Sequence, residues 1–308
     1  KFLERVNGGC QLVLILVMLC FFFSMLITND VALITFVPLG IQVLGMLGEE
    51  RKKKLLIPVV VLQTIAANLG SMLTPIGNPQ NLYLYARADM KGMEFFKLMI
   101  PYSTLALVML SIWCIIIGRK DGAKQMAFER KETLIDRKKL VGWSILFFLC
   151  IATVAGKIPY TWTFGGVVAG GFFLDKKIFC KVDYALLGTF LGFFVFIGNM
   201  GRMEVFRNGL ESVINGNEVI TSIVASQVIS NVPTALLLSG FTQDIKSLII
   251  GTNLGGLGTL IASMASLISF RYIGADDKGK RLSYLRYFTI ANIFFLAILF
   301  FFYMMNIM

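Results

Sequence analysis

Long apolar stretches alternate with short polar or basic segments along the whole chain. Several of these stretches approach the roughly 18 to 20 residues that an α-helix needs to cross a bilayer, whereas others cover only about half of it. The alternation predicts an all-α polytopic membrane protein. The apolar stretches lie at about 11–27, 31–46, 55–67, 98–118, 140–156, 162–174, 184–200, 219–229, 233–242, 247–270 and 287–306.

The composition excludes an ordinary soluble domain. Of the 308 residues, 56% are hydrophobic and 15% are charged, whereas roughly a quarter are charged in a soluble domain. The chain has no histidine, and its five cysteines are scattered without a C-x-x-C pair. These features argue against a metalloenzyme and against a disulfide-stabilised domain, and we expect no cofactor.

The net charge of +11 comes from basic clusters that lie between the apolar stretches. The clusters at 51–54, 119–139 and 271–286 face the same side of the membrane only if segments 11–46 and 219–242 each return to the side that they entered. The positive-inside rule then assigns these clusters to the cytoplasm. The charge pattern therefore predicts two re-entrant hairpins and a cytoplasmic connector at 119–139, and it gives no support for nucleic-acid binding.

Two matched pairs of motifs indicate an internal repeat. The tripeptide TND at 28–30 interrupts one apolar run, and SNVP at 230–233 interrupts another. Each is followed by a loop, at 68–81 and at 253–263, in which Asn-Leu-Gly-x-x-x-Thr-x-Ile matches position for position. Pro- and Gly-rich loops of this kind cannot stay helical. Two breaks in corresponding places are typical of secondary transporters built from inverted repeats.

The motifs divide the chain into two repeats joined by the connector. The second repeat has scaffold helices that the first lacks, and we therefore expect that an amino-terminal part precedes Lys1. The first repeat, 1–118, is expected to contain hairpin 11–46, broken helix 55–87 and helix 98–118. The second repeat, 140–308, is expected to contain scaffold helices 140–200, hairpin 219–242, broken helix 247–270 and helix 287–306.

At these residues the chain resembles the ion transporter superfamily, which includes divalent anion:sodium symporters, citrate transporters and arsenite permeases. The two tips resemble that family's paired Ser-Asn-Thr tips, and the Asn-Leu-Gly loops resemble its discontinuous helices. The resemblance implies alternating access and covers essentially the whole chain. Asp30 and Val232 stand where the sodium/dicarboxylate branch has threonines, so the chain departs from the pattern of that branch at both tips.

Asp30 is the acidic residue that lies deepest between apolar arms, and intramembrane carboxylates are usually functional. It could bind Na⁺, carry a proton, or cap the second arm of its hairpin. The amides and hydroxyls of the tips and loops could bind ion or solute, cap helices, or pack between them. The expected ion-binding residues are Thr28, Asn29, Asp30, Asn68, Gly70, Thr74, Ser230, Asn231, Asn253 and Gly255. The expected substrate-binding residues are Asn29, Asn231, Asn78, Gln80, Thr259 and Ser263, and Ser71 supplies a further hydroxyl.

Together these features predict a secondary transporter of a small anion such as a carboxylate or an oxyanion, coupled to Na⁺ or H⁺, in the plasma (inner) membrane. A Na⁺/H⁺ antiporter that uses Asp30 is the alternative. An intramembrane enzyme is more remote, because the sequence has no G-x-S-x-G, H-E-x-x-H or P-loop motif. The expected partners are the solute and the lipid bilayer; a homodimer is left open, and no nucleic acid is expected.

Overall fold

The computed structural model describes residues 8–119, 137–154, 156–182, 184–200, 202–276 and 278–307, and every regular element in these ranges is helical. The chain forms two compact units, one of residues 1–128 with 193–308 and one of residues 129–192. The boundary between the units falls within α8 (Tyr184–Met200). The all-helical fold class expected from the sequence is confirmed.

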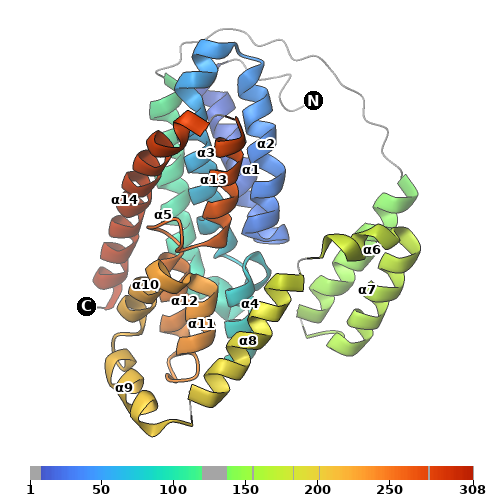
Figure 1. Cartoon of the computed structure of the whole chain (residues 1–308), viewed down its shortest axis with the longest axis vertical. Helices are drawn as coiled ribbons and strands as arrows, with labels where there is room; N and C mark the ends of the chain where they lie inside the picture. The colour runs from blue at the N-terminus through green and yellow to red at the C-terminus, as the bar shows by residue number, and fades with distance from the viewer. Residues whose placement is uncertain are drawn as a thin grey trace. The chain divides into compact units, whose positions relative to one another are not determined.

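The larger unit begins with a tight helical hairpin (Figure 1). Helices α1 (Gly9–Ile27) and α2 (Asn29–Gly45) are joined by a single residue, Thr28, and pack against each other. A short turn then leads into α3 (Glu49–Ser71), which includes the basic cluster at 51–54 that the hydropathy pattern placed between elements. Lys and Arg are good helix formers, and Glu49 and Glu50 in the first turn favour the helix start.

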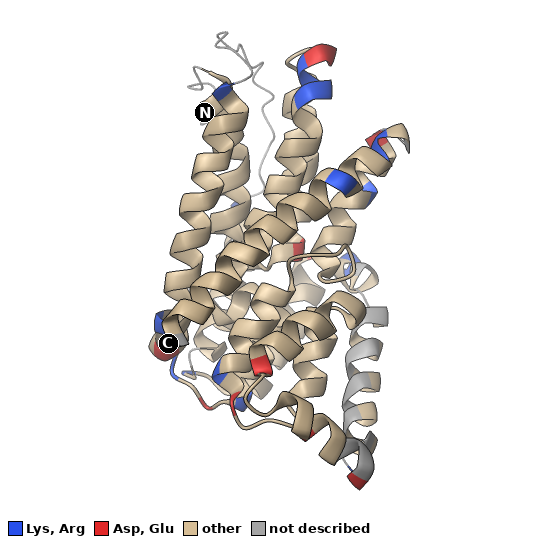
Figure 2. Cartoon of the chain, turned by 90° about the vertical axis from the view of Figure 1, so that its left-hand side faces the viewer, with Lys and Arg blue, Asp and Glu red and all other residues tan. Residues whose placement is uncertain are grey.

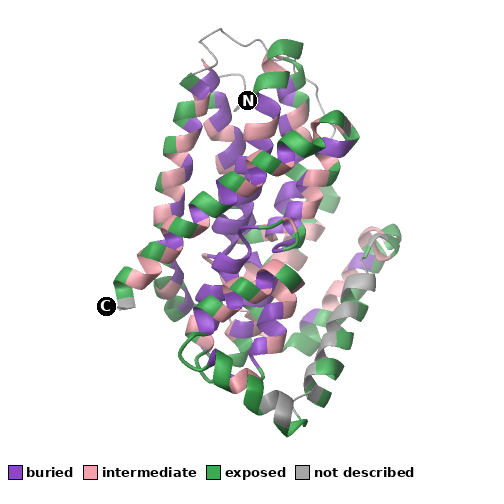
Figure 3. Cartoon of the chain, turned by 60° about the vertical axis from the view of Figure 1, so that its left-hand side comes forward, coloured by how far each residue is buried: buried purple, intermediate pink, exposed green. Residues whose placement is uncertain are grey.

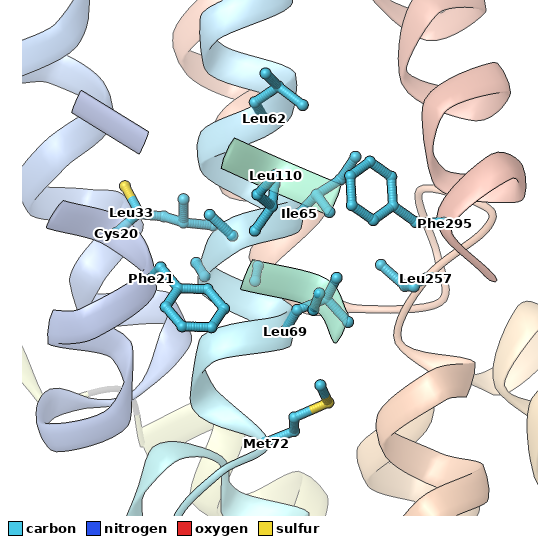
Figure 4. Packing of buried hydrophobic residues seen from close by; sticks show 14 of the residues in the cluster. Cys20, Phe21, Leu33, Leu62, Ile65, Leu69, Met72, Leu110, Leu257 and Phe295 are labelled. Atoms are coloured by element: carbon cyan, nitrogen blue, oxygen red, sulfur yellow. The ribbon is translucent and has the colours of Figure 1, made fainter. Parts of the chain in front are cut away.

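Helix α3 is the centre of the core. It contacts α1, α2, α5 (Gly92–Arg119), α13 (Met264–Asp276) and α14 (Arg281–Ile307). Figure 4 shows its side chains between Phe21 and Leu33 on one side and Phe295 and Leu257 on the other. Residues from both halves of the sequence therefore share one core.

The first broken helix consists of α3, a short 3₁₀ turn (Pro75–Gly77) and α4 (Pro79–Arg87). The second half of the sequence repeats this order with shorter pieces. An amphipathic helix α9 (Glu204–Ile214) precedes the hairpin α10 (Glu218–Ile229) and α11 (Asn231–Leu238), which Ser230 alone connects. Helix α12 (Ile245–Gly255), an irregular segment and α13 then form the second broken helix.

The smaller unit contains α6 (Arg137–Val154), α7 (Tyr160–Leu174) and a 3₁₀ turn (Lys176–Lys181). Helices α6 and α7 pack against each other, and the hydroxyls of Thr153 and Thr163 are hydrogen-bonded between them. Most of the large apolar side chains of this unit are exposed. A membrane protein exposes such side chains to lipid or to another protein surface.

Four of the described helices, α1, α3, α5 and α14, are long and apolar enough to cross a membrane. In the larger unit, Lys, Arg, Asp and Glu concentrate towards the two ends of the helices, and few lie between (Figure 2). Figure 3 shows buried residues along the helices and both buried and exposed residues in the irregular segments, in which Thr259 and Ile261 are exposed. The buried part of each break is thus packed in protein, one of the surroundings in which a bilayer tolerates unwound backbone.

Candidate functional site

The two hairpin tips have the same unusual backbone conformation. Thr28 has φ 70° and ψ 151°, and Ser230 has φ 72° and ψ 154°. This region of φ and ψ is populated almost only by glycine, and a residue with a side chain there costs on the order of 1–3 kcal/mol. Two such residues in matching sequence motifs indicate that the tips are built to one plan.

Each break also contacts its own hairpin in the same way. The hydroxyl of Thr74 donates to Met25 O (2.5 Å), three residues before the first tip. The hydroxyl of Thr259 donates to Gln227 O (3.1 Å), three residues before the second tip. Each break is therefore anchored to the first arm of its hairpin by an equivalent threonine.

A second equivalent contact explains the glycine of each Asn-Leu-Gly motif. A Cβ atom on Gly70 would lie 2.0 Å from Phe21 O and 2.6 Å from Ser24 Oγ. A Cβ atom on Gly255 would lie 2.6 Å from Ser226 Oγ. Glycine is required at both positions because the end of the broken helix touches the backbone or a serine of the first hairpin arm.

Asn68 connects the first tip to both breaks. Its Oδ1 atom accepts hydrogen bonds from Asn29 Nδ2 (3.0 Å) and from Ser263 Oγ (3.0 Å). Asn29 is the first residue of α2, and Ser263 lies at the end of the second break. Three segments that are distant in sequence therefore meet at one buried amide.

Asn253, the counterpart of Asn68, makes the reciprocal connection. Its Nδ2 atom donates to Asn81 Oδ1 (2.7 Å) in α4, the second half of the first broken helix. Asn81 in turn donates to Ser71 O (3.3 Å) and Thr74 O (3.4 Å) of the first break. Each broken helix is thus bonded to the other through the asparagine of its Asn-Leu-Gly motif.

Several buried polar atoms around these contacts have no hydrogen-bond partner. They include Asp30 Oδ1, Asn68 Nδ2, Asn253 Oδ1 and both side-chain heteroatoms of Gln80. An unsatisfied buried polar group costs about 1–3 kcal/mol, so such atoms are usually paired. Their presence here leaves both donors and acceptors available to a bound ion or solute.

The remaining predicted residues are placed as follows. Asn78 is buried and donates to Ser71 Oγ (2.8 Å), which closes the first break. Two hydrogen bonds join the second tip to the second break: Asn231 N (3.0 Å) and Ser230 Oγ (3.4 Å) both donate to Ala262 O. The side chain of Asn231 lies close to Gly256, the residue after the Asn-Leu-Gly motif. The structure thus brings together three of the predicted residues, Asn29, Asn68 and Ser263. Thr259, in contrast, is exposed, and its hydroxyl donates to Gln227 O.

The sequence did not single out two residues that organise these segments, Asn81 and Gln227. Gln227 lies in α10, and its Nε2 atom donates to Gly255 O (3.1 Å) and Leu257 O (3.0 Å) of the second break. A glutamine in an apolar helix is a detectable signal, but its partners depend on how the helices pack. Gln63 is similar: it lies inside α3 and donates to Leu16 O (3.2 Å) and Phe36 O (3.0 Å) of the first hairpin.

Comparisons with known proteins agree with this geometry. Residues 1–247 match the family described as citrate transporter (CitMHS). The chain is 31% identical over 293 residues to an uncharacterized transporter of Methanocaldococcus jannaschii, a match that covers 91% of this chain and 78% of that protein. It is 30% identical over 287 residues to the inner membrane protein YbiR of Escherichia coli, covering 90% and 73%. An uncharacterized transporter of Mycobacterium tuberculosis is 21% identical over 304 residues, covering 86% and 70%.

The resemblance to the ion transporter superfamily is therefore confirmed. The expectation that the chain is not an enzyme is confirmed with it, because the family is one of transporters and two of the three relatives are named as transporters. The chain belongs to the citrate transporter family and is a membrane transporter.

Proposed function

We propose that this chain moves a small anion, such as a carboxylate or an oxyanion, across the plasma (inner) membrane by alternating access, coupled to Na⁺ or H⁺. The observation that carries the proposal is the meeting of the first tip and both helix breaks at Asn68, beside buried polar atoms that have no partner. The description of the family makes citrate the first solute to test.

The architecture that supports this function is a pair of inverted repeats with re-entrant hairpins. The matching tips, threonine contacts and glycine contacts support the repeat. Arms of 12 and 8 residues in α10 and α11 reach about 18 and 12 Å at 1.5 Å per residue, against a hydrocarbon core of about 30 Å. A hairpin this short enters and leaves on the same side.

The free polar atoms suit an anion accompanied by a cation. Asn68 Nδ2 and Gln80 Nε2 are amide donors for carboxylate or oxyanion oxygens, and Asp30 Oδ1 and Asn253 Oδ1 are acceptors for a cation. Unwound backbone and helix ends add carbonyl ligands and partial charges of both signs.

A Na⁺/H⁺ antiporter is a second candidate because of Asp30. Its Oδ1 atom is buried and unpartnered, so the carboxylate needs either a cation beside it or a proton. Vesicles loaded with a pH indicator distinguish the two candidates: an antiporter moves protons when Na⁺ alone is added, whereas an anion transporter also requires its solute.

The experiment that tests the main proposal is uptake of radiolabelled citrate, and of a panel of other carboxylates and oxyanions, into proteoliposomes that hold the full chain. Asn29→Ala and Asn231→Ala should each lose uptake while membrane insertion stays normal, because these side chains lie at the tips. Asn306→Ala, at an exposed position near the end of α14, is the matched control. Uptake of no tested anion by the parent chain, or full uptake by both tip variants, would contradict the proposal.

A further inference from the structure

Gln227 fills the second break with its side-chain amide. The Nε2 atom donates to Gly255 O and Leu257 O of the break and also lies 3.0 Å from Ile223 O of its own helix, and the Oε1 atom accepts from Thr259 N (2.9 Å). Gly258 has φ +112°, and a Cβ atom on it would lie 2.2 Å from Gln227 Oε1. The second break is therefore shaped closely around this one side chain.

The corresponding position in the first half is Met25. The backbone carbonyl of Met25 accepts the hydroxyl of Thr74, as that of Gln227 accepts the hydroxyl of Thr259, so the two positions are structurally equivalent. A thioether has no hydrogen to donate. Gly70 O, the counterpart of Gly255 O, accepts from the backbone N–H groups of Met72 and Leu73. Among the residues that the structure describes, no side chain donates to Met72 O, the counterpart of Leu257 O.

A second difference between the halves also favours cation binding in the first half. Asp30 follows the first tip asparagine, whereas Val232 follows the second. The first half therefore combines a carboxylate oxygen without a partner with a break that no glutamine fills. The second half lacks the charge, and its carbonyl oxygen at Leu257 is bonded to the Gln227 amide, whereas that of Met72 in the first half has no side-chain donor within the described part of the chain.

We infer that the amide of Gln227 takes the position that a coupling cation takes in the first half, so that the transporter binds its coupling cation in the first half only. Carbonyl oxygens of unwound membrane helices are cation ligands, and an NH₂ group with two hydrogens satisfies two of them without carrying a charge. The amide is covalently fixed, so it holds the second break in shape throughout the cycle. This inference rests on the proposed cation-coupled transport.

The test measures the Na⁺ dependence of variants at Gln227 in the full chain. Gln227→Glu replaces both donor hydrogens with a carboxylate that faces carbonyl oxygens, an arrangement that needs a cation between them. Gln227→Met introduces the residue of the first half. The melting temperature and the uptake rate are measured while NaCl replaces choline chloride at constant ionic strength.

We expect each variant to bind one Na⁺ more than the parent, so that the Hill coefficient for Na⁺ is higher by about one. Gln243→Glu, the same change at an exposed position in the α11–α12 turn, should leave the Na⁺ dependence unchanged. The reciprocal variant Met25→Gln should place an amide in the first break and lower the apparent Na⁺ affinity about tenfold or more.

Parent-like Na⁺ dependence in monodisperse Gln227→Glu and Gln227→Met overturns the inference. If both variants fail to fold, Met25→Gln decides, because unchanged cation dependence in that variant overturns it as well. A parent chain that transports no anion contradicts the proposed function instead. In that case the Na⁺ dependence of the melting temperature of the Gln227 variants still tests the inference, because it measures cation binding without transport.

Discussion

The hydroxyl of Ser263 donates a hydrogen bond of 3.0 Å to Asn68 Oδ1, and this bond joins the second broken helix to the first. Asn68 lies in the last turn of α3, directly before the first break, and Ser263 lies at the end of the break that precedes α13. Any rearrangement that separates the two breaks must break this bond or carry both residues together.

Ser263→Ala should therefore weaken the junction of the two broken helices. We expect the free energy of unfolding to fall by about 1 kcal/mol, the usual net value of a hydrogen bond, and uptake to fall further because Asn68 loses one of its two fixed partners. Unfolding in SDS and uptake in proteoliposomes measure the two effects.

Ser103→Ala is the matched control for that variant. The hydroxyl of Ser103 is also buried but has no partner, so its removal should leave stability unchanged or slightly higher. Equal effects of the two serine variants would show that the bond to Asn68 contributes nothing.

The tip conformation predicts an unusual tolerance of glycine. Thr28→Gly and Ser230→Gly should each keep or raise the melting temperature, because relief of about 1–3 kcal/mol of backbone strain exceeds the entropy cost of glycine. Thr35→Gly, in the middle of α2, should instead lower stability by about 1 kcal/mol. Lower melting temperatures for both tip variants would contradict the strain described here.

Asp30→Asn separates the three roles that remain open for this carboxylate. If Asp30 binds Na⁺, the variant needs much more Na⁺ for half-maximal uptake, which is the outcome that we expect because a formal charge is lost. If it carries the coupling proton, solute exchange continues but accumulation driven by a pH gradient stops. If it only caps α2, the variant behaves like the parent, since Asn and Asp are comparable caps. Glu49→Gln, at an exposed helix start, is the control.

Two ion pairs at helix starts predict unequal effects of the same substitution. Lys52 Nζ lies 2.6 Å from Asp276 Oδ1, and both side chains are less than one-fifth exposed, at 18% and 16%. Lys246 Nζ lies 2.7 Å from Glu94 Oε1, with 57% and 48% exposed. Lys52→Met should cost about 1–3 kcal/mol of unfolding free energy, and Lys246→Met less than about 1 kcal/mol. Equal losses would show that burial does not decide the strength of these pairs.

Membrane topology is tested with cysteines at Glu50 and Lys91, both exposed, in a background without the five native cysteines. The charge pattern places residues 51–54 in the cytoplasm and residues 88–97 outside. An impermeant maleimide added to intact cells should therefore label Lys91→Cys and spare Glu50→Cys. The reverse result would invert the orientation. Residues 119–139, expected to be the cytoplasmic connector, lie largely outside the described residues, since α5 ends at Arg119 and α6 begins at Arg137.

Local chemistry explains why the helices, tips and breaks could be predicted from the sequence. Twenty apolar residues have few alternatives to a helix in a membrane, and the cluster of prolines and glycine at 75–79 interrupts one, whereas single prolines such as Pro58 lie inside helices. Helix α9 was missed because its pattern is amphipathic and not uniformly apolar. The partners of Asn81 and Gln227 could not be predicted, because they follow from the packing of helices far apart in sequence.

The single-residue links at Thr28 and Ser230 have a mechanical consequence. A one-residue link has only two rotatable backbone bonds and cannot lengthen. The two arms of a hairpin therefore stay together at the tip while both remain helical. A displacement of either tip is transmitted along both arms to the far ends of the hairpin.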